Sequence, residues 1–97
     1  TRTIMAATRS GRARFRSWLR SPVPHLRDLR SELLLKLVFA ERLGIDVTGM
    51  LVEQRTVVDE LADGLSALGH GDPDVVTLWR AESAAAAQRF LAHLTTA

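Results

Sequence analysis

Apolar residues return every three to four positions along most of the chain, which is the period of an α-helix. The first such segment covers about residues 10–19 and is predicted to end before Pro22 and Pro24. The second covers about residues 26–43 and is followed by Gly44, a residue suited to a helix C-terminus. We therefore predict two helices in the first half of the chain, separated by a short proline-containing link.

The second half has the same periodicity in two longer segments. A third helix is predicted over about residues 47–68, with Asp46 or Thr48 as its N-cap and with Gln54 inside its apolar stripe. After the loop "GHGDP", Asp72 is the predicted cap of a fourth helix and Pro73 lies in its first turn. The predicted buried face of this fourth helix consists of Val75, Val76, Trp79, Ser83, Ala86, Ala87, Phe90 and Leu94. The expected fold class is all-α, with four helices.

The second predicted helix has more apolar surface than one small domain covers easily. Leu26, Leu29, Leu33, Leu37 and Ala40 form one stripe, and further apolar residues occupy much of the remaining circumference. A helix that is apolar nearly all round must be covered on more than one face, so we predict a homodimer. The residues expected in the dimer interface are Leu34, Leu35, Val38, Phe39, Trp79, Phe90 and Leu94.

Length and composition fit one helical domain. The 97 residues allow a single domain of limited core size, and the absence of cysteine excludes a disulfide. Residues 1–8 are the one stretch that suggests a short strand, so residues 9–97 are assigned to the helical domain. No apolar leader and no membrane-spanning stretch is evident, which favours a cytoplasmic protein without a membrane partner.

Candidate catalytic chemistry is sparse. His25, His70 and His93 are the only imidazoles, and none is spaced from another as metal ligands are on a helix. There is no nucleophile-elbow pattern and no phosphate-binding loop. We predict neither a catalytic site, a metal site nor a cofactor.

Basic residues are concentrated at the start of the chain. The first 20 residues carry six arginines and no carboxylate, whereas the remaining 77 carry seven basic and eleven acidic residues. One interpretation is a solvated cationic helix face, and the other is proximity to DNA phosphates. The residues concerned in the second interpretation are Arg9, Arg12, Arg14 and Arg16.

Several short motifs, in order, resemble the C-terminal region of PadR-like transcriptional regulators. Thr8-x-x-Gly11-Arg12 is similar to the family's join between its wing and the first C-terminal helix. The other matching pieces are Trp18-Leu19 with Pro22 and Pro24, Arg30 with Leu33 to Leu35, Lys36 and Phe39, then Gln54-Arg55, and finally Arg89-Phe90-Leu91, where Phe replaces a Trp. Together they extend over residues 8–94, which is nearly the whole chain.

The resemblance implies a helical dimerisation domain that follows a DNA-binding winged helix. The winged helix itself is missing from these 97 residues, so contact with DNA is expected only through that absent domain, and residues 1–8 would be the remnant of a wing strand. Some family members bind aromatic or cationic small molecules near the dimer interface, which makes Phe15, Trp18 and Trp79 candidate contacts for an aromatic effector. The alternative is a free-standing helical adaptor, or a truncated paralogue that acts through protein–protein contacts.

Overall fold

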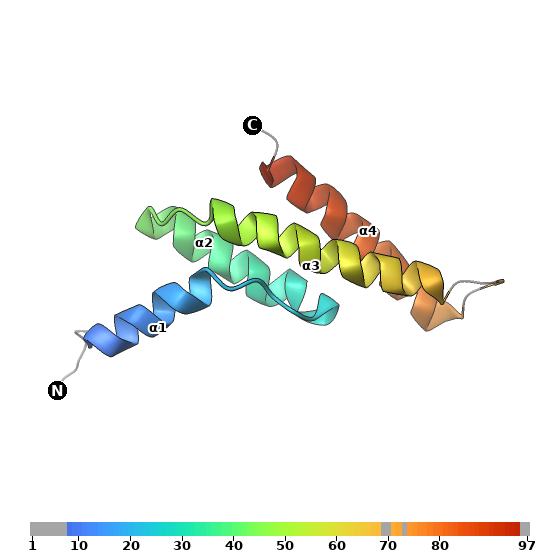
Figure 1. The fold of residues 1–97 in the computed structure, drawn as a ribbon, viewed down its shortest axis with the longest axis horizontal. Helices are drawn as coiled ribbons and strands as arrows, with labels where there is room; N and C mark the ends of the chain where they lie inside the picture. The colour runs from blue at the N-terminus through green and yellow to red at the C-terminus, as the bar shows by residue number, and fades with distance from the viewer. Residues whose placement is uncertain (1–7, 69–70, 73, 96–97) are drawn as a thin grey trace.

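Four α-helices make up most of the chain in the computed structural model, which describes residues 8–68, 71–72 and 74–95. They are α1 (Arg9–Leu19), α2 (Leu34–Leu43), α3 (Thr48–Ala67) and α4 (Val75–Thr95), and no strand occurs in the described residues (Figure 1). The predicted all-α fold class is thus confirmed. Each predicted helix is present; the second is α-helical only from Leu34 onward, and the ends of the others differ from the expected ones by a few residues.

The N-terminal end of α1 is closed by a side chain. Thr8 is the N-cap, and its hydroxyl accepts a hydrogen bond of 2.9 Å from the backbone N–H of Gly11. A Cβ at Gly11 would lie 3.0 Å from that hydroxyl, so the glycine leaves room for the cap. The strand suggested for residues 1–8 lies outside the described residues, except for Thr8, which belongs to the helix cap instead.

The second predicted helix is not uniform. It begins with a turn of 3₁₀ helix, η1 (Leu26–Asp28), continues as a π-helical segment, η2 (Leu29–Leu33), and becomes regular only in α2. Gly44 ends α2 in the left-handed conformation, with φ of 66°, and the N–H of Ile45 donates to the carbonyl of Ala40 at 2.9 Å. This is the C-terminal arrangement that the glycine predicted.

An aspartate lies at the start of each of the two long helices. The N-cap of α3 itself is Val47, which makes no side-chain cap, so the prediction of Asp46 or Thr48 as its N-cap was wrong by one residue. The Asp46 carboxylate accepts from the N–H and the hydroxyl of Thr48, and these hydrogen bonds lower the pKa of Asp46. Asp74 accepts from the N–H of Thr77 at 2.7 Å, which likewise lowers the pKa of Asp74. The prediction that Asp72 caps the fourth helix was therefore wrong by two residues, because α4 begins at Val75 and Asp74 directly precedes it.

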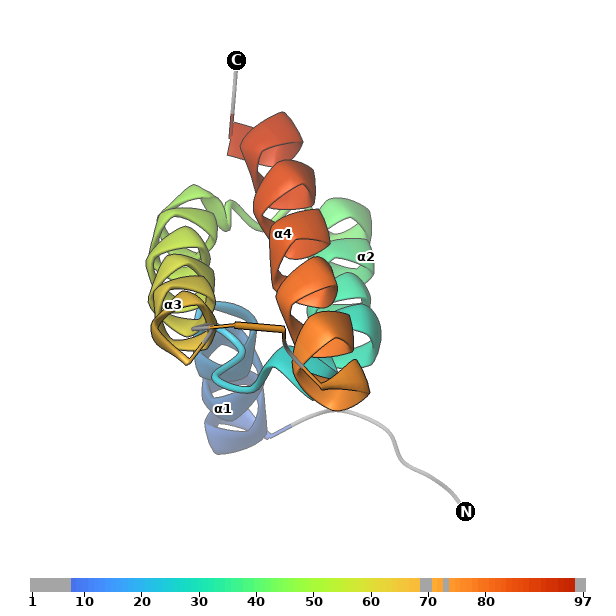
Figure 2. The ribbon, with the colours of Figure 1, turned by 90° about the vertical axis from the view of Figure 1, so that its right-hand side faces the viewer.

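The core lies where the irregular η1–η2 segment meets the hairpin of α3 and α4. Its buried members are Val23, Leu29, Leu33, Met50, Val58 and Leu91. In the view along the long axis, α4 lies between α3 and α2 (Figure 2). The molecule is thin, with extents of 59 × 33 × 17 Å, so many side chains reach only one layer of neighbours.

The buried face of α4 differs from the predicted one. Ala84 and Leu91 are the buried residues of this helix, whereas Val75, Val76 and Trp79 are exposed, Trp79 by 73%. The small side chain of Ala84 lets α4 lie close to the rest of the chain. The predicted apolar stripe exists, but it is rotated away from the chain's own core, and a single copy leaves it largely uncovered.

Candidate functional site

Lys36 is a buried cation at the junction of α1 and α2. Its side chain is 1% exposed, although the residue interrupts an otherwise apolar run in the sequence. The ammonium donates to the carbonyl oxygen of Ser21 at 2.6 Å and lies 3.4 Å from a carboxylate oxygen of Glu32. It also lies 5.0 Å from the centre of the Trp18 ring, in a cation–π arrangement. The contacts with Ser21 and Trp18 join α2 to the C-terminal end of α1, and the contact with Glu32 joins α2 to η2.

Gln54 makes a second buried polar contact, this one to the link that follows α1. Its side-chain oxygen accepts from the N–H of Val23 at 2.6 Å, and its side-chain amide donates to the carbonyl of Val23 at 2.8 Å. Both residues are completely buried. The amide therefore satisfies both backbone polar groups of Val23, which explains a polar residue inside the apolar stripe of α3.

Phe15, Trp18 and Phe39 form an aromatic cluster between α1 and α2. Phe15 and Phe39 meet edge to face with ring centres 5.5 Å apart, and Trp18 lies within 6.0 Å of Phe15 and 6.4 Å of Phe39. This cluster half-buries the ring of Phe39, which was predicted for the dimer interface; that assignment stays a prediction. The three predicted effector contacts are not brought together, since Trp79 lies elsewhere, on α4.

The basic side chains of α1 face solvent. Arg9, Arg12, Arg14 and Arg16 are exposed, and no hydrogen bond or ion pair joins their side chains to the described part of the chain. They give the solvent-facing side of α1 a cationic surface. That surface fits both interpretations given above, so DNA proximity stays a prediction.

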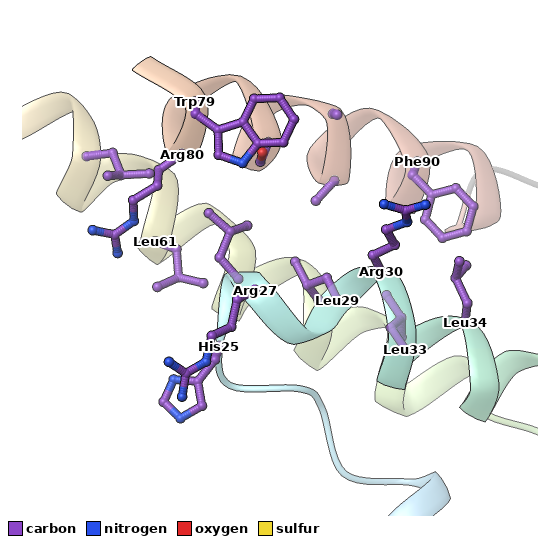
Figure 3. A pocket seen from close by; sticks show the side chains of 15 residues that line it. His25, Arg27, Leu29, Arg30, Leu33, Leu34, Leu61, Trp79, Arg80 and Phe90 are labelled. Carbon is purple, nitrogen blue, oxygen red and sulfur yellow. The ribbon is translucent and has the colours of Figure 1, made fainter. Parts of the chain in front are cut away.

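A large groove opens on the other side of the η2–α2 segment. It has a volume of about 990 Å³ and lies between the η1–η2–α2 segment and the hairpin of α3 and α4 (Figure 3). The lining residues are His25, Leu26, Arg27, Leu29, Arg30, Leu33, Leu34, Leu61, Leu65, Trp79, Arg80, Ser83, Ala86, Ala87 and Phe90. Most of these side chains are aliphatic or aromatic, and together they line an apolar groove.

The polar side chains of this groove are nearly all basic. Arg27 and Arg30 come from η1 and η2, Arg80 comes from α4, and His25 precedes η1. No carboxylate lines the groove. Figure 3 shows Arg30 extending from the η2 ribbon toward the α4 wall, on which Phe90 lies. The geometry combines an apolar lining with a rim of one charge sign, which is the usual pattern of a site for an amphipathic ligand.

Apolar residues beside this groove are also uncovered. Leu34 and Val38, four positions apart on α2, are 43% and 46% exposed. On α4, Trp79 and Phe90 line the groove themselves and are exposed. The large apolar residues exposed on α2 and α4 are Leu34, Leu35, Val38, Leu43, Val75, Val76, Leu78, Trp79, Phe90 and Leu94. Six of the seven residues predicted for a dimer interface are in this set, and Phe39 is the exception.

The described residues contain no group of three or more His, Asp or Glu side chains placed to hold a metal ion. None of the described helices combines the length and the apolar character needed to cross a membrane. No family model, no curated protein and no solved structure matches this chain. The resemblance to PadR-like regulators therefore rests on the residues quoted for it and on where those residues lie.

Sequence reasoning missed the basic rim of the groove. His25, Arg27 and Arg30 lie together within residues 25–30, but Arg80 comes from α4, so the sequence alone does not show that the four line one groove. Two buried polar residues did leave a signal. Gln54 occupies an apolar stripe, and Lys36 stands four positions after Glu32 inside an apolar run.

Proposed function

We propose that this chain is the dimerisation and effector-response domain of a PadR-like transcriptional regulator whose winged helix is not among these residues. Two chains would associate through the uncovered apolar face of α2 and α4 and so set the distance between two DNA-binding domains. The observation that carries the proposal is that face, because stable monomeric proteins rarely expose so many large apolar side chains together.

The motifs behind the resemblance support the same proposal through their places in the fold. Thr8 and Gly11 form the cap of α1, Trp18 and Lys36 pack at its other end, and Gln54 binds the link beyond it. Several residues quoted only for their order in the sequence thus cap α1, contact its C-terminal end or bind the link after it. In the proposed regulator, α1 is the connection between the DNA-binding domain and the dimerisation domain.

Association is tested with a matched pair of substitutions. Val38→Glu places a carboxylate on the uncovered face of α2, whereas Val52→Glu makes the same change at a 56% exposed position of α3. We expect the wild type and Val52→Glu to be dimers at micromolar concentration, and Val38→Glu to be a monomer, because a charge buried at an interface is costly. Light scattering measures the three masses. A monomeric wild type would overturn the proposal.

DNA proximity is tested in the intact regulator. Replacing Arg12, Arg14 and Arg16 by glutamate should weaken operator binding and reduce its dependence on salt, because fewer counterions are released on binding. Arg89→Glu, on α4 and far along the chain, is the control and should leave both unchanged. Equal binding by the triple variant across salt concentrations would leave only a solvated helix face. The nucleotide sequence upstream of Thr1 separates this proposal from the free-standing adaptor, since only a regulator has a winged helix in frame there.

A further inference from the structure

The groove between the η1–η2–α2 segment and the α3–α4 hairpin is lined by basic side chains, which favour anionic over cationic ligands. We infer that it binds a single-chain acyl carboxylate, such as a fatty acid, with the carboxylate at the arginine rim and the acyl chain along the apolar lining. The binding site lies on one chain and does not require dimerisation. Its regulatory meaning, given below, rests on the proposed function.

The sign of the ligand charge follows from the rim. Arg27, Arg30 and Arg80 line the groove with His25, and no carboxylate lines it. None of these four side chains has a hydrogen bond or an ion pair within the described residues, so their donors are free to bind an anion. A cationic effector, which some PadR-like proteins accept, would meet three like charges here. The groove is therefore suited to an anion with an apolar body.

The size and the lining of the groove indicate an acyl chain. Its volume of about 990 Å³ is at the upper end of the range for small-molecule sites. Leu29, Leu33 and Leu65 form its buried floor, and the apolar surface still open to water comes from the half-buried Leu26 and Leu61 and from the exposed Leu34, Trp79 and Phe90. A single-ring acid would leave most of this apolar surface in contact with water. A flexible chain of ten or so carbons would cover it, because the favourable free energy grows with the apolar area removed from water.

A helix of a second copy fits this groove less well. Most of the exposed large apolar residues lie on α2 and α4, which carry only Glu41 and Glu82 as carboxylates. Lys36 is buried, so the exposed basic residues of these helices are Arg42, Arg80 and Arg89, and the formal charge of their exposed groups is 3 − 2 = +1. Placing such a helix against the arginine rim would bring like charges together. A second copy is expected to cover the neighbouring apolar face and to leave the rim for an anion.

A ligand in the groove could displace α1 through the short link that joins α1 to the wall of the groove. One wall is η1 and η2, which are 3₁₀ and π-helical rather than α-helical, and such segments occur often at functional sites. The chain just before this wall is the link 20–25, where Val23 is bound by Gln54 and the carbonyl of Ser21 by Lys36. A ligand that draws Arg27 and Arg30 toward its carboxylate would displace this wall and, through the link, α1. In the proposed regulator, that displacement changes the spacing of the DNA-binding domains.

Calorimetric titration of the chain tests the inference with three ligands of defined charge. The probes are dodecanoate, dodecyltrimethylammonium and benzoate, each kept below the concentration at which micelles form. We expect dodecanoate to bind about tenfold more tightly than dodecyltrimethylammonium, which is what a few partly exposed charges contribute together. Benzoate should bind more weakly still. Equal affinity for the two dodecyl compounds, or tighter binding of benzoate than of dodecanoate, would overturn the inference.

Substitutions locate the site. Arg30→Gln combined with Arg80→Gln should weaken dodecanoate binding about fivefold, because two exposed charge contacts are lost. Arg89→Gln removes an exposed arginine of α4 that does not line the groove, and should leave the affinity unchanged. An equal loss in both variants would mean that dodecanoate responds only to net charge, which contradicts a site in the groove.

Light scattering on the same samples separates this inference from the proposed function. A dimer that shows no preference for dodecanoate leaves the proposed function standing and removes the acyl-carboxylate site. A monomer that selects dodecanoate, and loses that selection in the Arg30→Gln, Arg80→Gln variant, keeps the site and removes the dimerisation proposal.

Discussion

The two sides of the η2–α2 segment differ in how far one chain satisfies their polar groups and covers their apolar ones, although residues of the two sides alternate in the sequence. On the side of α1, the buried polar groups of Lys36 and its neighbours all have partners within one chain. On the side of the groove, the Arg30 side chain has no polar partner within the described residues, and Leu34 is 43% exposed. The difference teaches that folding of one chain buries and pairs the groups that face α1, whereas the groups that face the groove remain available to a ligand or a second chain.

The largest effect on stability is expected at Gln54, whose buried hydrogen bonds hold the link after α1. Gln54→Leu keeps the size of the side chain but leaves the N–H and the carbonyl of Val23 buried without partners. The free energy of unfolding should fall by about 2 to 5 kcal/mol, measured by urea denaturation. Gln88→Leu is the matched control, because that amide donates to Asp59 at the surface, and it should cost less than about 0.5 kcal/mol. A loss at Gln54 as small as that at Gln88 would show that the buried contacts carry no special weight.

A smaller effect is expected at Lys36. Lys36→Met retains the apolar stem but removes the donor to the Ser21 carbonyl and the charge over Trp18. We expect the free energy of unfolding to fall by about 1 to 3 kcal/mol, together with a change in the near-ultraviolet circular dichroism of Trp18. Arg42→Met, at an exposed position of the same helix, should change neither. An unaltered Trp18 signal in Lys36→Met would contradict the contact between the two side chains.

On the exposed side of the groove, an equally large change of side chain should hardly alter the stability of a single chain. Trp79→Ser removes a large ring that is 73% exposed, so the unfolding free energy of dilute, monomeric protein should change by less than about 0.5 kcal/mol. Association stabilises the folded state by a free energy that grows with the logarithm of protein concentration, so the wild-type Tm should rise with concentration and the Trp79→Ser Tm should not. Differential scanning calorimetry over a hundredfold concentration range, with Trp79→Phe as control, measures this. Parallel behaviour of wild type and Trp79→Ser would remove Trp79 from the interface.

The smallest effect concerns the exposed helix caps and depends on pH. Hydrogen bonds from Thr77 lower the pKa of Asp74 below its ordinary value of 3.8 in the folded state. A lowered pKa means that the stabilisation is present above pH 3.8 and disappears as the pH falls through the folded-state value. Tm should therefore decrease slightly below pH 3.8. Asp74→Asn, which still accepts the hydrogen bond but does not titrate, should show a weaker pH dependence than the wild type in thermal circular dichroism.

Helix number and order were predictable because each helix depends on local information. Periodicity located the segments, and Gly44 marked a C-terminus correctly, because its left-handed conformation suits few other residues. The cap of α4 was misplaced because Asp72 and Asp74 are both chemically suitable, and only the actual helix start decides between them. The 3₁₀ and π-helical turns before α2 were also missed, since Leu29 and Leu33 keep ordinary helical spacing in the sequence.

The candidate site was less predictable, because it depends on which faces meet. The periodicity of α4 identified an apolar stripe, yet the chain buries the face of Ala84 and Leu91 instead and leaves Trp79 exposed. A stripe alone does not say whether it faces the chain's own core or a second chain. The groove needed the η1–η2–α2 segment, α3 and α4 to be placed relative to one another before Arg30 and Arg80 could line the same groove.

The helix α1 projects from the rest of the molecule in Figure 1 and is held chiefly near its C-terminal end. Its 11 residues correspond to a length of about 16 Å, so a tilt of roughly 10° at Trp18 would move Thr8 by about 3 Å. A small rotation of α1 near Trp18 hardly displaces the core, but it produces a much larger displacement at the N-terminal end of the helix, at Thr8. A domain joined to this end of α1 would therefore be displaced when the groove on the other side of the η2–α2 segment changes shape.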